Sequence, residues 1–163
     1  MGYPLTLPVG SILYFDTGTD LVTPTWTKVS EHNRGPINLD LIRLEKTQRM
    51  SNGLLRKYWI ADKKNLSASW NMLPSRSDMT VDGGWGAVDI QEFYMLATKG
   101  RSSFKVKIVY GQKVQGGVKV ERSEEFVAVF SQCTFTVLKR NVKEKSTDAA
   151  QEFWNVSIAL EEV

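Results

Sequence analysis

Residues 37–64 read INLDLIRLEKTQRMSNGLLRKYWIADKK, two strand-like runs that meet at Asn52-Gly53. Asn-Gly between two such runs is a strong hairpin signal, because both residues tolerate a positive φ. The stretch therefore predicts an antiparallel hairpin over about residues 37–64. Its strands exceed the usual length of about five or six residues, so the end of the hairpin is expected to project beyond the core.

The predicted tip of this hairpin consists of Arg49, Asn52, Gly53 and Arg56. If Asn52-Gly53 is a two-residue loop, Arg49 lies directly opposite Arg56. Like charges in that position are mildly destabilising. Three interpretations follow: the register differs, an acidic surface of another subunit receives the arm, or the two arginines splay into water.

Charge is concentrated in the same stretch. The whole chain carries a net charge of +3, which is too mild to argue for nucleic-acid binding. Residues 43–64 hold seven basic and two acidic residues, a net charge of +5, so the remaining chain carries −2.

Composition predicts one β-rich domain over residues 1–163. Of these residues 42% are hydrophobic and 24% are charged, as in ordinary globular chains. Pro4 and Pro8 predict an extended N-terminal arm over residues 1–10. No window reaches eighteen apolar residues, so no segment is expected to span a bilayer.

The rest of the chain predicts short strands and one helix. Ile90, Phe93, Tyr94 and Ala97 share one face of a helix over about 88–98. Alternating apolar residues predict eight or nine strands in all. Expected strands outside the hairpin lie near residues 11–15, 26–30, 66–73, 104–109, 118–121, 126–138 and 154–160. The fold class predicted from this pattern is mainly β: an antiparallel sandwich or barrel with one short flanking helix and a projecting hairpin.

Residues for catalysis are scarce. Cys133 is the single cysteine and lies in a strand-like run, where an inert buried thiol is the expected state. His32 is the single histidine and lies in a polar, turn-rich stretch. The glycines after Asp82 match no phosphate-binding pattern and predict a flexible turn anchored by Trp85. We expect no enzyme activity, no catalytic residue, no metal site and no cofactor.

Residues 49–64 and 66–74 resemble virion structural proteins of tailed bacteriophages, most closely tail tube proteins. The resemblance covers about residues 25–110. It implies a β-sandwich with a flanking helix and a long hairpin. Subunits of this kind form stacked hexameric rings, and their hairpins build a continuous inner barrel through which double-stranded DNA passes. The implied partners are further copies of the chain and other tail or neck proteins, without a membrane. The implied location is the virion, after synthesis in the bacterial cytoplasm.

The hairpin departs from the resemblance in its charge. The lumen of tube proteins is commonly acidic, whereas residues 43–64 are basic. A neck, terminator, baseplate or capsid-decoration protein also fits. A different class is a small nucleic-acid-binding module, in which Tyr58 and Trp59 stack on bases, although aromatic residues on strands more often belong to the core.

Overall fold

The structure, a computed structural model, describes residues 12–19, 22–143 and 150–163. The predicted N-terminal arm over residues 1–10 lies outside the described residues. The elements along the chain are β1 (Leu13–Asp16), β2 (Trp26–Lys28), β3 (Asn38–Arg49), β4 (Leu55–Pro74), the 3₁₀ helix η1 (Ser77–Met79), α1 (Ala87–Met95), β5 (Phe104–Gln115), β6 (Val118–Lys143) and β7 (Ala150–Glu162).

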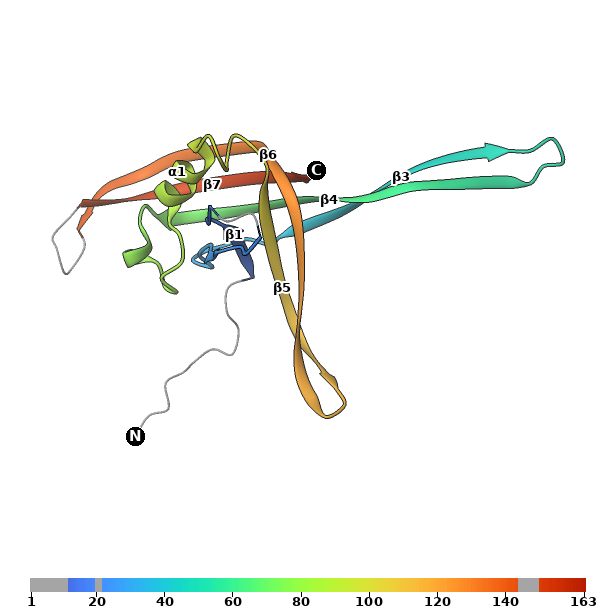
Figure 1. Cartoon of the computed structure of the whole chain (residues 1–163). Helices are drawn as coiled ribbons and strands as arrows, with labels where there is room; N and C mark the ends of the chain where they lie inside the picture. Colours follow the sequence, from blue (N-terminus) through green and yellow to red (C-terminus); the bar gives the residue numbers. More distant parts are fainter. Residues whose placement is uncertain (1–11, 20–21, 144–149) are drawn as a thin grey trace.

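The seven strands form one antiparallel sheet in the order β2-β1-β5-β6-β7-β4-β3. The sheet curls into a half-barrel (Figure 1). The predicted mainly β fold with one short helix is confirmed, and its strands belong to a single curled sheet. Fewer strands occur than expected because β4 and β6 each join two predicted segments. The intervening residues 62–65 and 122–125 are polar but contain no glycine or proline that would interrupt a strand.

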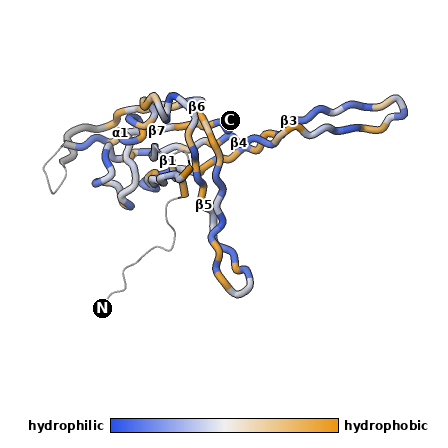
Figure 2. Tube along the Cα trace, viewed as in Figure 1, coloured by the Kyte–Doolittle hydropathy of each residue, from blue (hydrophilic) through white to orange (hydrophobic). Residues whose placement is uncertain are grey.

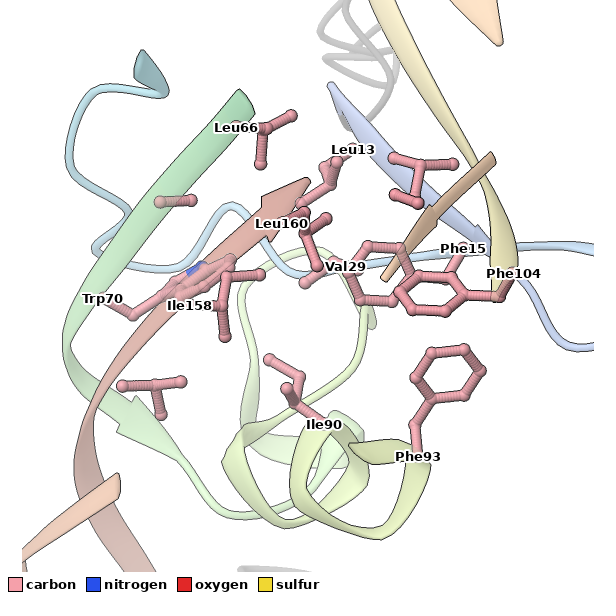
Figure 3. Close-up of a cluster of buried hydrophobic side chains, with 14 of the residues drawn as sticks. Leu13, Phe15, Val29, Leu66, Trp70, Ile90, Phe93, Phe104, Ile158 and Leu160 are labelled. Atoms are coloured by element: carbon pink, nitrogen blue, oxygen red, sulfur yellow. The ribbon is translucent and has the colours of Figure 1, made fainter. Parts of the chain in front are cut away.

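The hydrophobic core lies between the concave face of the sheet and α1. Figure 3 shows Ile90 and Phe93 of α1 directed towards side chains of the strands. The ring of Phe93 stacks on Phe15 with centroids 5.3 Å apart and meets Phe104 edge-on at 4.9 Å. Trp70 is buried, and its indole N–H donates to the Ser30 carbonyl at 2.7 Å. The largest core side chain therefore keeps its polar group satisfied.

The helix is shorter than predicted. Its first turn is held by Asp89, whose Oδ2 accepts the N–H of Gly86 at 3.1 Å. It ends at Met95 because Leu96 takes an extended conformation, with ψ at 130°. The predicted apolar face is therefore correct at Ile90 and wrong at Ala97, which follows the helix and is exposed.

The loop before α1 is anchored by Asp82 as well as by Trp85. The Asp82 carboxylate accepts hydrogen bonds from the Ser30 hydroxyl at 2.9 Å, the Glu31 N–H at 2.9 Å and the Gly84 N–H at 3.0 Å. Trp85 bridges to Val29 as a short parallel pair. These contacts hold the loop against the segment that follows β2, so the glycines here serve the fold.

Two hairpins extend away from this core in different directions (Figure 1). β7 ends at Glu162. Its neighbours β4 and β6 run antiparallel to it, and their first residues, from Leu55 and from Val118, lie beyond that end. We call residues 40–65 the first arm, with Asp40 and Asn65 at its base, and residues 110–122 the second arm. Figure 2 shows hydrophobic and hydrophilic residues along both arms. The predicted projecting hairpin is thus confirmed, and a second one accompanies it.

Candidate assembly surface

The tip of the first arm is a three-residue loop, Ser51–Gly53, and the expected two-residue loop is wrong. The N–H of Met50 donates to the Leu54 carbonyl at 2.7 Å, and the N–H of Gly53 donates to the Met50 carbonyl at 2.9 Å. Gly53 has a φ of 87°, while Asn52 does not take the positive φ that a type I′ loop requires of both its residues. Instead, Asn52 Oδ1 accepts the N–H of Leu54 at 3.1 Å. A turn followed by one left-handed glycine is the common three-residue loop.

The longer loop changes the strand register. Arg49 pairs with Leu55, and Arg56 pairs with Gln48. Because side chains alternate along a strand, Arg49 and Arg56 lie on opposite faces of the arm. The expected like-charge pair is therefore wrong, and the first interpretation, a different register, applies. Arg49 Nη1 donates to the Gly53 carbonyl at 2.8 Å, so Arg49, Asn52 and Gly53 lie together and Arg56 lies apart from them.

The inner face of the first arm continues the concave face of the sheet, and its charges form pairs within the chain. Arg43 Nε lies 2.8 Å from Asp62 Oδ1, and Lys57 Nζ lies 2.8 Å from Glu45 Oε2. The Trp59 indole N–H donates to Asp62 Oδ1 at 3.0 Å. Hydrogen bonds from Arg43 and Trp59 lower the pKa of the Asp62 carboxyl. On this face Arg43 and Lys57 therefore have carboxylate partners within the chain, whereas Arg49 near the tip donates to a backbone carbonyl.

The outer face of the first arm lies on the opposite side. It is formed by Asp40, Ile42, Leu44, Lys46 and Gln48 of β3 and their cross-strand partners Asn65, Lys63, Ala61, Tyr58 and Arg56 of β4. A bulge at Leu44 and Glu45 leaves Ile60 unpaired between Ala61 and Trp59, and the side chain of Ile60 is 65% exposed. Tyr58 is 51% exposed on this face and Trp59 is 62% exposed on the inner face. Both aromatic residues therefore lie outside the core, contrary to the usual burial of strand aromatics.

The second arm is the feature that the sequence analysis missed. It turns at Gly116 and Gly117, whose φ angles are 59° and 80°. Val114 and Val118, on either side of the turn, are exposed. Gly-Gly between valine-rich runs is itself a hairpin signal, so these residues could have indicated the arm. The strands expected near residues 104–109 and 118–121 left the residues between them outside any strand.

Polar contacts join β4 and β6 at the base of the two arms, where β7 ends. The backbone N–H of Lys64 donates to Glu162 Oε2 at 2.9 Å. The Lys64 ammonium lies 3.9 Å from Glu124 Oε2 and 5.6 Å from the centre of the Phe126 ring. Lys64 belongs to β4, whereas Glu124 and Phe126 belong to β6. The side chain of Lys64 therefore bridges the fork between the arms.

The described residues outside the arms present little chemistry. Cys133 is half-buried on β6, and burial raises the pKa of its thiol to about 12. A thiol with that pKa is a poor nucleophile at neutral pH. His32 Nδ1 accepts the backbone N–H of Val81 at 3.2 Å. Within ranges 12–19, 22–143 and 150–163, no three His, Cys, Asp or Glu residues gather as metal ligands.

Neither the models of protein families nor the curated proteins match this chain. In the part of the chain that the structure describes, no helix has the length and apolar character needed to cross a membrane. The projecting arms are therefore the features from which a function can be argued.

Proposed function

We propose that this chain is a non-enzymatic structural subunit of a phage virion, a tail tube protein that forms stacked hexameric rings around a DNA-conducting channel. Its partners would be further copies of itself and other tail or neck proteins. Double-stranded DNA would pass through the lumen without sequence-specific contacts. A neck, terminator, baseplate or decoration protein is the nearest alternative within the same class.

The first arm is the observation that carries this proposal. All of residues 40–60 are exposed, and they include Leu41, Leu44, Trp59 and Ile60. A lone domain gains nothing from holding large apolar side chains in water, whereas a partner surface would cover them. β3 is also an edge strand of the sheet, and its open backbone groups can pair with a neighbouring chain.

The basic charge of the arm bears on where it would lie. Residues 46–57 contain four basic residues and no acidic residue: Lys46, Arg49, Arg56 and Lys57. A basic surface would hold passing DNA by its phosphates. In the proposed tube, the end of the arm would therefore meet protein and would not line the channel.

The test replaces residues 48–57 by a short turn. Because these residues contribute nothing to the core, we expect the variant to fold with a native circular dichroism spectrum. Wild-type protein should form rings or tubes in negative-stain electron microscopy, and the shortened variant should remain unassembled. Val81→Ala, a change at an exposed loop residue, serves as the control and should assemble normally. Normal tubes from the shortened protein would contradict the role of the arm.

The exposure of Tyr58 and Trp59 favours a second candidate, a single-stranded nucleic-acid-binding module. Exposed aromatic rings beside basic residues can stack on bases. Trp59 is tethered to Asp62 through its N–H, which leaves Tyr58 as the freer platform. A wild-type protein that stays monomeric and retards single-stranded DNA in a salt-dependent manner would support this candidate over assembly.

A further inference from the structure

The two faces of the first arm differ in whether their charged side chains form ion pairs within the chain. On the inner face, Arg43 and Lys57 have carboxylate partners within the chain. On the outer face, Asp40, Lys46 and Arg56 form no ion pair with any residue that the structure describes, and the same holds for Glu161 on the neighbouring strand β7. Lys63, the remaining outer-face cation, donates to the carbonyl of Val163 at 2.6 Å.

These unused charges are separated along the outer face by sign. Asp40 lies at the base of the arm, where it pairs with Asn65, and Asn65 pairs in turn with Glu161. Lys46 and Arg56 lie towards the tip. Between the two ends lie the apolar side chains of Ile42, Leu44 and Tyr58, with Lys63 opposite Ile42. Because Lys63 is hydrogen-bonded to Val163, the charges without an ion pair are acidic at the base and basic at the tip, and the middle between them is largely apolar.

The acidic base is also hollowed. Asp40, Asn65 and Glu161 line a depression of about 200 Å³ on the surface. β6 bulges beside it at Ser131, which also lines the depression. One water molecule occupies roughly 30 Å³, so the depression has room for the head of an arginine or lysine side chain.

We propose that the outer face of the first arm binds the outer face of a second copy of this chain, with the two arms antiparallel. Lys46 and Arg56 of one copy would then reach the depression between Asp40 and Glu161 of the other copy. The apolar middles would cover one another. Each copy supplies both halves of the contact, so neither the depression nor the basic tip is complete without the partner.

Charge complementarity selects a second copy as the occupant. Nucleic acid would be attracted to the basic tip, but Asp40 and Glu161 would repel its phosphates from the base. A second copy matches both ends at once, and the apolar middle gains from burial that nucleic-acid phosphates cannot supply. The inference rests on the proposed function in one respect: it requires that copies of this chain associate.

The test exchanges charge between the two ends. The tip variant is Lys46→Glu/Arg56→Glu, and the base variant is Asp40→Lys/Glu161→Lys. Each should associate at least about tenfold more weakly than wild type, because each places like charges in contact. Their equimolar mixture should recover association to within about threefold of wild type, since every contact between unlike copies is again between opposite charges. Sedimentation velocity over a dilution series measures all three.

The control variant is Arg101→Glu/Lys105→Glu, which carries the same charge change as the tip variant at an exposed and a partly exposed residue outside both arms. It should associate like wild type. Circular dichroism on every variant establishes that the changes leave the fold intact.

The outcomes separate this contact from the proposed function. Recovery in the mixture supports the tip-to-base contact. If both swapped variants associate like wild type, the contact is overturned while assembly itself stands. If both variants associate more weakly and their mixture does not recover, the contact is also overturned, because the tip and base charges then affect association without contacting one another. A wild-type protein that stays monomeric at every concentration overturns the contact and the assembly proposal together. If that monomer retards single-stranded DNA and the tip variant does not, the basic tip binds nucleic acid instead.

Discussion

Burial in this protein is decided by what covers a residue and not by the residue alone. Phe93 and Trp59 are both large aromatic residues in locally apolar stretches, yet Phe93 is 2% exposed and Trp59 is 62% exposed. The side chains of Leu66, Ala68 and Trp70, which alternate along the strand expected near residues 66–73, face the core. The first arm also holds large apolar residues, but no second layer of the described chain lies above its strands (Figure 1). A local pattern cannot distinguish the two situations, because the covering helix α1 is remote in sequence.

Phe93 is the residue on which the core can be tested. It contacts Phe15, Phe104 and Phe130 within the aromatic cluster. Phe93→Ala should lower the free energy of unfolding by about 3–5 kcal/mol, because it removes the buried ring and leaves a cavity. Met95→Ala, on an exposed face of the same helix, should change it by less than about 0.5 kcal/mol. Urea denaturation followed by circular dichroism measures both, and equal losses in the two variants would contradict this packing.

At the scale of elements, the positions of the strands were predictable, but their full lengths and the loop geometry were not. Asn52-Gly53 correctly marked the turn of the first arm. The choice between a two-residue and a three-residue loop depends on whether Asn52 takes a positive φ, and its type alone permits either. That choice, together with the bulge that leaves Ile60 unpaired, moved Arg56 to the outer face, so the candidate contact with a second copy could not be read from the sequence.

Gly53 tests whether an arm behaves independently of the core. Its φ of 87° is costly for a residue with a side chain, although a Cβ there would meet no atom within 4 Å. Gly53→Ala should therefore destabilise the loop by about 1 kcal/mol through backbone strain alone. Amide hydrogen exchange at Met50 and Leu54 should become severalfold faster, while the urea midpoint of the whole domain stays unchanged.

The matched control is Gly111→Ala in the second arm, where the added Cβ also meets no atom within 4 Å and φ is not positive. It should leave exchange at Met50 and Leu54 as in wild type. A loss of global stability in Gly53→Ala would show that the first arm is energetically coupled to the core.

At the scale of the whole molecule, the sheet divides where β7 ends. β4 and β6 are both neighbours of β7, and past Glu162 they leave with different partners, β3 and β5. The sequence predicted the antiparallel class because only one helix was available to connect the strands. It could not predict the fork, since the strand order that places β7 between β4 and β6 arises from contacts distant in sequence.

Lys64 is the side chain that spans this fork, from β4 to Glu124 and Phe126 of β6. Lys64→Ala should leave the core folded but broaden the range of angles between the two arms, because it removes the cross-fork ion pair and ring contact. Spin labels at Ser51→Cys and Gln115→Cys, in a Cys133→Ser background, report the distance between the arm tips by pulsed electron resonance. The distance distribution should widen in Lys64→Ala and remain as in the labelled parent in Arg101→Ala, a change at an exposed residue away from the fork. An unchanged distribution in Lys64→Ala would mean that backbone twist alone sets the arms apart, and the bridge at Lys64 would then have no part in presenting them to a partner.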